Sequence, residues 1–246
     1  MTQGLYTILS NRCIARQVYE MVLQGDTSAL QAPGQFINIA LDGFFLRRPI
    51  SVCDYEPGRL TIIYKIVGKG TAYMSTLPAG AVLDILCGLG NGFNTEKSGA
   101  RPLLVGGGAG VPPMYSLAKQ LLSEGKQPIA VLGFNTAKEV FYGKQFEALG
   151  VHTLIATADG SVGIRGFVTD AIATLGSGAY TYYYACGPEP MLKALYTTCS
   201  TGGQLSFEER MGCGFGACMG CSCKTIYGNK RICKDGPVLA KEEILW

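Results

Sequence analysis

The stretch PLLVGGGAGVPP, residues 102–113, combines a short apolar run, a glycine-rich loop and two prolines. The run at 102–105 predicts a buried strand, and apolar residues recur at helical spacing from 112 to 122. Prolines are tolerated here because the first turn of a helix has N–H groups without intrahelical partners. The stretch therefore predicts a strand that enters a helix through a loop whose amides suit a phosphate group. The residues assigned to this phosphate site are Gly106, Gly107, Gly108 and Gly110.

The same order of elements continues along the chain. Alternating strands and helices are typical of a parallel, doubly wound α/β sheet, which binds ligands at the C-terminal ends of its strands. We therefore expect residues 98–203 to form a nucleotide-binding domain. Its further strands are predicted at 129–132, 153–156 and 180–185, and its further helices at 138–149, 166–175 and 189–199.

The glycine loop departs from the dinucleotide fingerprint G-x-G-x-x-G of Rossmann dehydrogenases. Val111 stands where the third glycine is expected, and no acidic residue follows the second strand. Neutral Asn135 and Thr136 stand there instead, without the cations that usually hold the 2′-phosphate of NADP. The sequence therefore argues against a Rossmann dehydrogenase and favours NAD over NADP.

The first third of the chain has the pattern of a small antiparallel β-barrel. Short strands separated by turn residues are predicted at 17–23, 36–39, 60–67 and 81–86, with a short helix at 72–77. Within this unit, Arg47-Arg48-Pro49-Ile50-Ser51 places fixed positive charge on a strand, and guanidinium groups bind phosphate oxygens bidentately. An exposed basic edge of the sheet explains these arginines equally well. We expect the barrel to span residues 1–97.

Cysteines gather near the C-terminus in residues 204–246, which we expect to form a third, small domain. Cys213, Cys218 and Cys221 have the C-x4-C-x2-C spacing of plant-type 2Fe–2S ligands, in a loop rich in glycine. A hairpin with its turn at Gly228-Asn229 would bring Cys233 back as the fourth metal ligand, leaving Cys223 as a free thiol nearby. A structural zinc site is the alternative, although zinc sites usually pair their cysteines at short, similar spacings.

Composition limits the class of protein. The formal charge of +3 is too small to indicate nucleic-acid binding. No run of eighteen apolar residues predicts a membrane span, and the N-terminus lacks the layout of a signal peptide. The remaining cysteines lie singly in apolar surroundings, as buried thiols do in a reducing compartment. We therefore expect a cytoplasmic location. No residue is assigned a catalytic role, since the sole histidine, His152, is expected to be structural.

Two segments resemble the flavin motifs of the ferredoxin–NADP reductase superfamily. Arg48-Pro49-Ile50-Ser51 is similar to its R-x-[YFI]-[ST] motif, in which the arginine holds the FAD pyrophosphate. The run from 63 to 71 is similar to its second flavin segment. The resemblance implies a bound FAD contacted by Arg48, Pro49, Ile50, Ser51, Ile63, Tyr64, Lys65, Gly70 and Thr71.

The nucleotide domain carries further landmarks of the same superfamily. Its glycine loop runs into proline, and Cys186-Gly187-Pro188-Glu189-Pro190-Met191 matches the C-G-P-x-x-M turn that closes the domain. The segment 157–166 is similar to the third strand and its loop. The resemblance implies that Cys186, Gly187 and Pro188 join the glycine loop in binding NAD.

With the cysteines last in the order, the whole chain resembles the electron-transfer subunits of NAD-dependent (class 1B) dihydroorotate dehydrogenases. The resemblance implies an oxidoreductase subunit of pyrimidine (UMP) biosynthesis. Electrons from the FMN of a separate catalytic subunit would pass through a 2Fe–2S cluster and FAD to NAD+, in a heterotetramer with two of each subunit. Lys224, Lys230 and Arg231 are possible contacts to that partner. The alternatives are a flavin and iron–sulfur reductase serving an oxygenase or sulfide dehydrogenase, and a zinc-binding interaction module.

Overall fold

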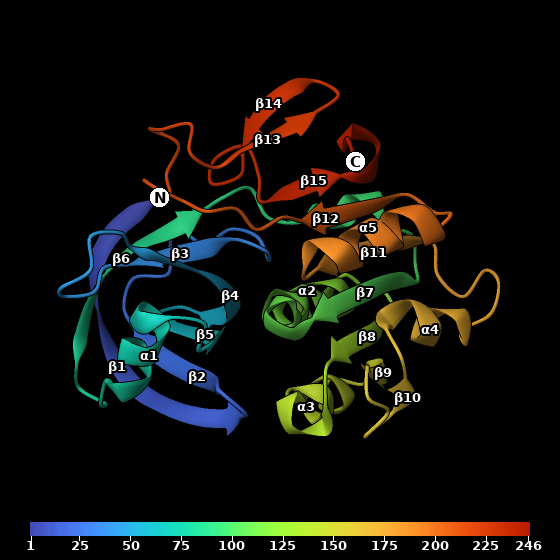
Figure 1. Ribbon diagram of the computed structural model, residues 1–246, viewed down its shortest axis with the longest axis horizontal. Helices are drawn as coiled ribbons and strands as arrows, with labels where there is room; N and C mark the ends of the chain where they lie inside the picture. The colour runs from blue at the N-terminus through green and yellow to red at the C-terminus, as the bar shows by residue number, and fades with distance from the viewer.

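The computed structural model describes residues 1–246 and places a β-barrel beside an α/β sheet, with the C-terminal segment lying across the top of both (Figure 1). The barrel is closed, in the order β1-β2-β5-β4-β3-β6, and all its neighbours are antiparallel. Helix α1 (Lys69–Thr76) lies between β5 and β6 in the chain. The predicted barrel is confirmed. Its strands are β1 (Thr2–Ala15), β2 (Val18–Gln24), β3 (Phe36–Ile39), β4 (Arg48–Glu56), β5 (Arg59–Lys65) and β6 (Val82–Leu89).

The second unit is a seven-stranded sheet in the order β10-β9-β8-β7-β11-β12-β15, parallel except for its last strand. Within this unit the first strand, β7, lies in the middle of the sheet. The chain adds β8, β9 and β10 on one side of it and then returns to add β11 and β12 on the other. The strand order therefore reverses between β7 and β11, where such sheets bind ligands. The predicted doubly wound domain is confirmed. Its strands are β7 (Pro102–Gly107), β8 (Ile129–Phe134), β9 (His152–Thr157), β10 (Ile164–Arg165), β11 (Tyr182–Cys186), β12 (Gly203–Ser206) and β15 (Val238–Ala240). Its helices are α2 (Val111–Ser123), α3 (Gly143–Ala148), α4 (Val168–Ala173) and α5 (Glu189–Thr198).

The helix expected at 138–149 is shorter than the sequence pattern indicates. A single 3₁₀ turn, η3 (Ala137–Glu139), comes first, and α3 begins only at Gly143. Between them Tyr142 adopts a left-handed conformation with φ of 64°. Its hydroxyl donates a hydrogen bond of 2.9 Å to the carboxylate of Glu20 on β2. A contact with the barrel therefore overrides the local helical preference.

The C-terminal segment is anchored to both units. A two-stranded hairpin forms from β13 (Ser222–Thr225) and β14 (Gly228–Arg231). The expected turn at Gly228-Asn229 was wrong, because Thr225 pairs with Gly228 and leaves Ile226 and Tyr227 at the turn. The three remaining 3₁₀ turns are η1 (Thr95–Lys97), η2 (Gly108–Gly110) and η4 (Lys241–Glu243).

The loop after β6 attaches this segment to the barrel. The Asn91 side chain donates to the carbonyl of Val238 at 2.8 Å and accepts the N–H of Val238 at 3.1 Å. Gly90, at φ of 77°, packs so closely on Pro237 that a Cβ there would lie 2.5 Å from the proline ring. Because β15 also extends the seven-stranded sheet, the segment after residue 203 is built into its neighbours. No helix of the structure has the length and apolar character needed to cross a membrane.

Candidate functional site

The arginine motif lies at the start of β4, against the first turn of α1. Gly70 is buried beside Arg48, and a Cβ at Gly70 would lie 2.1 Å from the guanidinium Nε. The Thr71 hydroxyl accepts N–H groups from the preceding loop at 3.0 and 3.3 Å and so holds that loop in place. Helix N-termini present free N–H groups to anions. Arg48, Gly70 and Thr71 thus form a positive cradle of the kind that fits the phosphates of FAD.

Other residues of the predicted flavin site divide between two faces of the barrel wall. Ile50 packs against the barrel core, and Pro49 and Ser51 are half-buried. Tyr64 directs its hydroxyl inward, where it donates a 2.8 Å hydrogen bond to Asn11. The Tyr64 side chain is therefore used inside the barrel. Ile63 belongs to the buried cluster shared with the nucleotide domain.

The glycine loop and the C-G-P turn lock together at the ends of β7 and β11. A Cβ at Gly110 would lie 2.0 Å from the carbonyl oxygen of Cys186, and one at Gly107 would lie 2.6 Å from the sulfur of Met191. A Cβ at Gly106 would lie 2.8 Å from the Cα of Val111, which occupies the position of the missing third glycine. The structure thus brings together Gly106, Gly107, Gly110 and Cys186, although they are far apart in the sequence.

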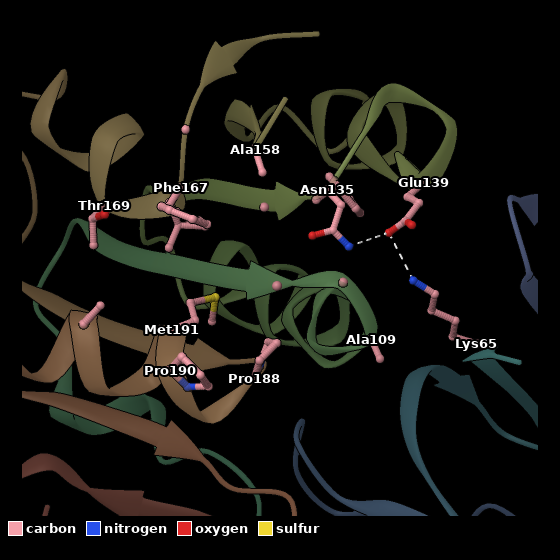
Figure 2. A pocket seen from close by; sticks show the side chains of 17 residues that line it. Lys65, Ala109, Asn135, Glu139, Ala158, Phe167, Thr169, Pro188, Pro190 and Met191 are labelled. Carbon is pink, nitrogen blue, oxygen red and sulfur yellow. Dashed lines mark hydrogen bonds and ion pairs between the residues drawn. The ribbon is translucent and has the colours of Figure 1, made fainter. Parts of the chain in front are cut away.

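A cavity of about 430 Å³ opens beside this loop, at the switch point of the sheet. Gly107, Gly108 and Pro188 line it, together with residues that follow β8 and β9. The remaining walls are largely apolar, with Phe167 and Met191 facing each other in Figure 2. Its place and lining suit a dinucleotide whose phosphates lie over the glycine loop.

The charged side chains that line this cavity are Lys65 and Glu139, and they are paired with each other. The Lys65 ammonium reaches across from the barrel and lies 3.1 Å from a carboxylate oxygen of Glu139, which also accepts a 3.1 Å hydrogen bond from Asn135 (Figure 2). Since its single cation is already neutralised, the cavity offers no free positive charge to a 2′-phosphate. This electrostatic balance favours NAD over NADP.

The predicted metal ligands meet in two pairs. The sulfur atoms of Cys213 and Cys218 are 3.4 Å apart, and the sulfur of Cys221 accepts the N–H of Cys233 at 3.4 Å. No three histidine, cysteine or acidic side chains converge as they would around a single metal ion. Two pairs of thiolates are what a two-iron cluster needs, with two sulfur ligands for each iron.

The loop around Cys213 favours a thiolate. Burial alone would raise the pKa of Cys213, but N–H groups of Cys218, Phe215 and Ala217 lower it to about 6. Cys233 is different, because burial and its neighbour Cys221 raise its pKa to about 12. A bound cation would reverse that effect, since metal coordination deprotonates thiols.

Cys223 lies on β13, two residues after Cys221. It borders a separate small hollow with Phe207, Glu209 and Trp246. Burial, and after it the nearby carboxylates of Glu209 and Glu189, raise the pKa of its thiol. Its treatment as a free thiol outside the ligand set stays a prediction.

Comparison with known proteins gives two matches to family models. The iron–sulfur cluster binding domain of dihydroorotate dehydrogenase B matches residues 208–245, and the oxidoreductase NAD-binding domain matches residues 104–196. The dihydroorotate dehydrogenase B (NAD(+)) electron transfer subunit of Bacillus caldolyticus is 46% identical, over 97% of each chain. The Fusobacterium nucleatum subunit of the same name is 44% identical, over 97% of this chain and 96% of its own. The chain belongs to this family of electron transfer subunits.

Solved structures agree with this family. An NADH-dependent reduced ferredoxin–NADP oxidoreductase shares 30% identity and a TM-score of 0.90, over 99% of this chain and 90% of its own. Phthalate dioxygenase reductase, at 21% identity, has a TM-score of 0.67 over 79% of this chain and 63% of its own and shares the fold. The chain is thus an oxidoreductase subunit that uses FAD, a 2Fe–2S cluster and NAD.

Several residues of the site carried no signal in the sequence. Glu139 meets Lys65 only because the barrel and the nucleotide domain face each other. Asn38 touches the cysteine loop from 175 residues away. Phe167 is 70% exposed at the cavity mouth and resembles any surface residue in sequence. Long-range contacts of this kind leave no local spacing to detect.

Proposed function

We propose that this chain takes electrons from the FMN of a dihydroorotate-oxidising catalytic subunit and delivers them to NAD+, in the pathway to UMP. The observation that carries the proposal is the combination of sites in one molecule. One chain holds the cysteine pairs, the Arg48 cradle beside α1, and the cavity at the glycine loop. FAD, when bound, exchanges a hydride with nicotinamide and single electrons with the cluster.

Each site residue has a proposed task in this function. Arg48, Gly70 and Thr71 hold the FAD phosphates, and Pro49, Ser51 and Lys65, together with the backbone of Ile50, Ile63 and Tyr64, form the wall beside the flavin. The NAD phosphates bind at Gly106, Gly107, Gly108 and Gly110, with Cys186, Gly187 and Pro188 closing the site. Cys213, Cys218, Cys221 and Cys233 ligate the iron atoms.

Exposed apolar side chains on the cysteine loop support a partner at this end of the molecule. Phe215 is 44% exposed and Met219 is 60% exposed, both within the loop that carries the ligands. Two of the cations expected to reach the partner are used internally instead. Lys230 is paired with Glu243, and Arg231 binds Asp235 and donates to the carbonyl of Gly216 at 2.7 Å. We propose Phe215 and Met219 as contacts to the catalytic subunit, in a heterotetramer with two of each subunit.

All ten cysteines are free of disulfide bonds, which supports the proposal of a reducing, cytoplasmic setting.

A second function is favoured by the 30% identity to an NADH-dependent ferredoxin–NADP oxidoreductase. In that case the cluster would exchange electrons with a different protein partner. The division into units at 1–97, 98–203 and 204–246 remains our proposal for their domain boundaries.

The test is a reconstitution under anaerobic conditions. The chain is co-purified with the catalytic subunit encoded in the same organism, and NADH formation is followed after dihydroorotate is added. We expect NADH to form only when both subunits are present. A stable, fully loaded complex that oxidises dihydroorotate with a dye but makes no NADH would refute the proposal. Electron exchange with ferredoxin in place of the catalytic subunit would support the second function.

A further inference from the structure

Asn38 lies where the strand beside the flavin motif meets the cysteine loop. Asn38 is buried, with 1% of its surface exposed. Strand β3 runs antiparallel to β4, with Asn38 opposite Pro49 and Phe36 opposite Ser51. Directly opposed residues in a sheet place their side chains on the same face. Asn38 and Phe36 therefore share the outer face of the barrel with Pro49 and Ser51 of the flavin motif.

The same side chain is pressed against the cysteine loop. Its Nδ2 donates to the carbonyl oxygen of Cys213 at 3.4 Å. The next residue, Gly214, has φ of 77° and lies so close that a Cβ there would be 2.2 Å from Nδ2. Only glycine fits this approach without a shift, so the loop and the amide are matched to each other.

The other end of the amide has no partner within the protein. The Asn38 Oδ1 atom is buried and accepts no hydrogen bond. An unsatisfied buried acceptor costs about 1–3 kcal/mol, so proteins rarely keep one without a use. Pro49 and Ser51 lie beside it on the same face, and these residues are assigned to the flavin wall. A flavin has donors for this acceptor, in its imide N–H and its ribityl hydroxyls.

We propose that Asn38 is a positioning residue between the two cofactors of this chain. Its Nδ2 holds the Cys213 carbonyl, and its Oδ1 offers a hydrogen-bond acceptor to the bound FAD. One short side chain thereby fixes the cysteine loop relative to the flavin wall. Hydrogen bonds around ligating cysteines also set the reduction potential of a cluster. The inference rests on the proposed function, since it requires both cofactors in one chain.

The test compares Asn38→Leu with a matched control, Asn91→Leu. Leucine is close to asparagine in size and removes both polar contacts. Asn91 also ties the barrel to the C-terminal segment, but its side chain bonds to the backbone of Val238 and, at 3.4 Å, to the carbonyl of Asp235, and to no cysteine. Anaerobic stopped-flow spectroscopy follows FAD and cluster reduction by NADH separately. Electron paramagnetic resonance records the reduced cluster, and titration of the FAD-free chain measures FAD affinity.

For Asn38→Leu we expect FAD reduction by NADH to stay within about twofold of the wild type, with cluster reduction about tenfold slower. The resonance of the cluster should shift, and FAD affinity should fall about fivefold for one lost hydrogen bond. Asn91→Leu should leave all four readouts unchanged. If Asn38→Leu fails to load iron, Asn38→Asp replaces it. That variant keeps the acceptor and loses the Nδ2 donor, so the resonance should shift while FAD affinity falls less than twofold.

Wild-type cluster reduction, resonance and FAD affinity in the Asn38 variant would overturn the inference. Identical changes in Asn38→Leu and Asn91→Leu would also overturn it, because they would indicate general loosening of the C-terminal segment. Failure of the proposed function would give a different experimental result. In that case the wild-type complex makes no NADH from dihydroorotate, while FAD affinity and the cluster resonance still report on Asn38.

Discussion

Gly110→Ala tests whether the nucleotide site depends on the close contact between the glycine loop and the C-G-P turn. The φ of Gly110 is −84°, so alanine meets no backbone strain and the effect is purely one of space. Its Cβ would lie 2.0 Å from the carbonyl oxygen and 2.3 Å from the carbonyl carbon of Cys186. Ordinary contact begins near 3.4 Å, so two backbone segments must separate by more than an ångström.

Overpacking typically costs about 1–3 kcal/mol, and a clash with backbone atoms belongs at the upper end. For a chain of this size, about 3 kcal/mol lowers the Tm by roughly 6–12 °C. Because the displaced loop is also the proposed phosphate site, hydride transfer from NADH to FAD should slow by about 100-fold. Scanning calorimetry and anaerobic stopped-flow spectroscopy measure the two effects.

Gly125→Ala is the control for this prediction. Gly125 follows α2 with φ of 74°, and a Cβ there would meet no atom within 4 Å. Alanine should cost about 1 kcal/mol through backbone strain and leave hydride transfer unchanged. The reasoning is refuted if Gly110→Ala melts within about 2 °C of Gly125→Ala. Wild-type hydride transfer in a destabilised Gly110→Ala would show that the loop does not position the nucleotide.

Three further predictions concern the other sites. Cys218→Ala should abolish the cluster but retain FAD, whereas Cys223→Ala should keep full iron content. Iron and flavin analysis of both variants measures this, and retained iron in Cys218→Ala contradicts the ligand set. Arg48→Ala should weaken FAD binding about tenfold or more by removing a charged phosphate contact, at unchanged iron content, as measured by flavin fluorescence. Asp84→Asn should lose up to about 1 kcal/mol of stability at pH 7. The hydrogen bond from Arg47 lowers the pKa of Asp84 in the folded state. The stability that the ionised Asp84 contributes is therefore complete above about pH 4 and disappears as the pH falls further. Urea unfolding that shows the same stability difference between wild type and variant at pH 3 and pH 7 contradicts this.

Local patterns predicted the features that depend on neighbouring residues. The glycine loop, the alternation of strands and helices, and the C-x4-C-x2-C spacing each occupy a short stretch of chain. The 14-residue strand β1 had no such signal, because its exposed Leu5 and Leu9 blur the alternation of inward and outward residues. The early break before α3 was missed for a related reason. It depends on Glu20, which is 122 residues away from Tyr142 in sequence.

The arrangement of the sites depends on the interface between the barrel and the nucleotide domain. Polar contacts cross it, including Lys119 to Asp54 at 2.7 Å and Lys65 to Glu139 at 3.1 Å. Partly exposed pairs of this kind contribute about 1 kcal/mol or less each. The larger contribution comes from apolar burial, since Ile63 of the barrel shares one buried cluster with Met114 and Leu117 of α2.

Apolar packing is not directional, so it holds the two units together without fixing how they are rotated. The ion pairs supply that direction, because each joins one defined residue on each side. Lys65 follows two residues of the proposed flavin wall, and both Lys65 and Glu139 line the cavity proposed for the nucleotide. Under the proposed function the pair therefore links the two cofactor sites, and hydride transfer requires reacting atoms within about 3.5 Å. The Lys65–Glu139 pair matters for geometry more than for stability. Removing this pair should slow hydride transfer more than it destabilises the fold.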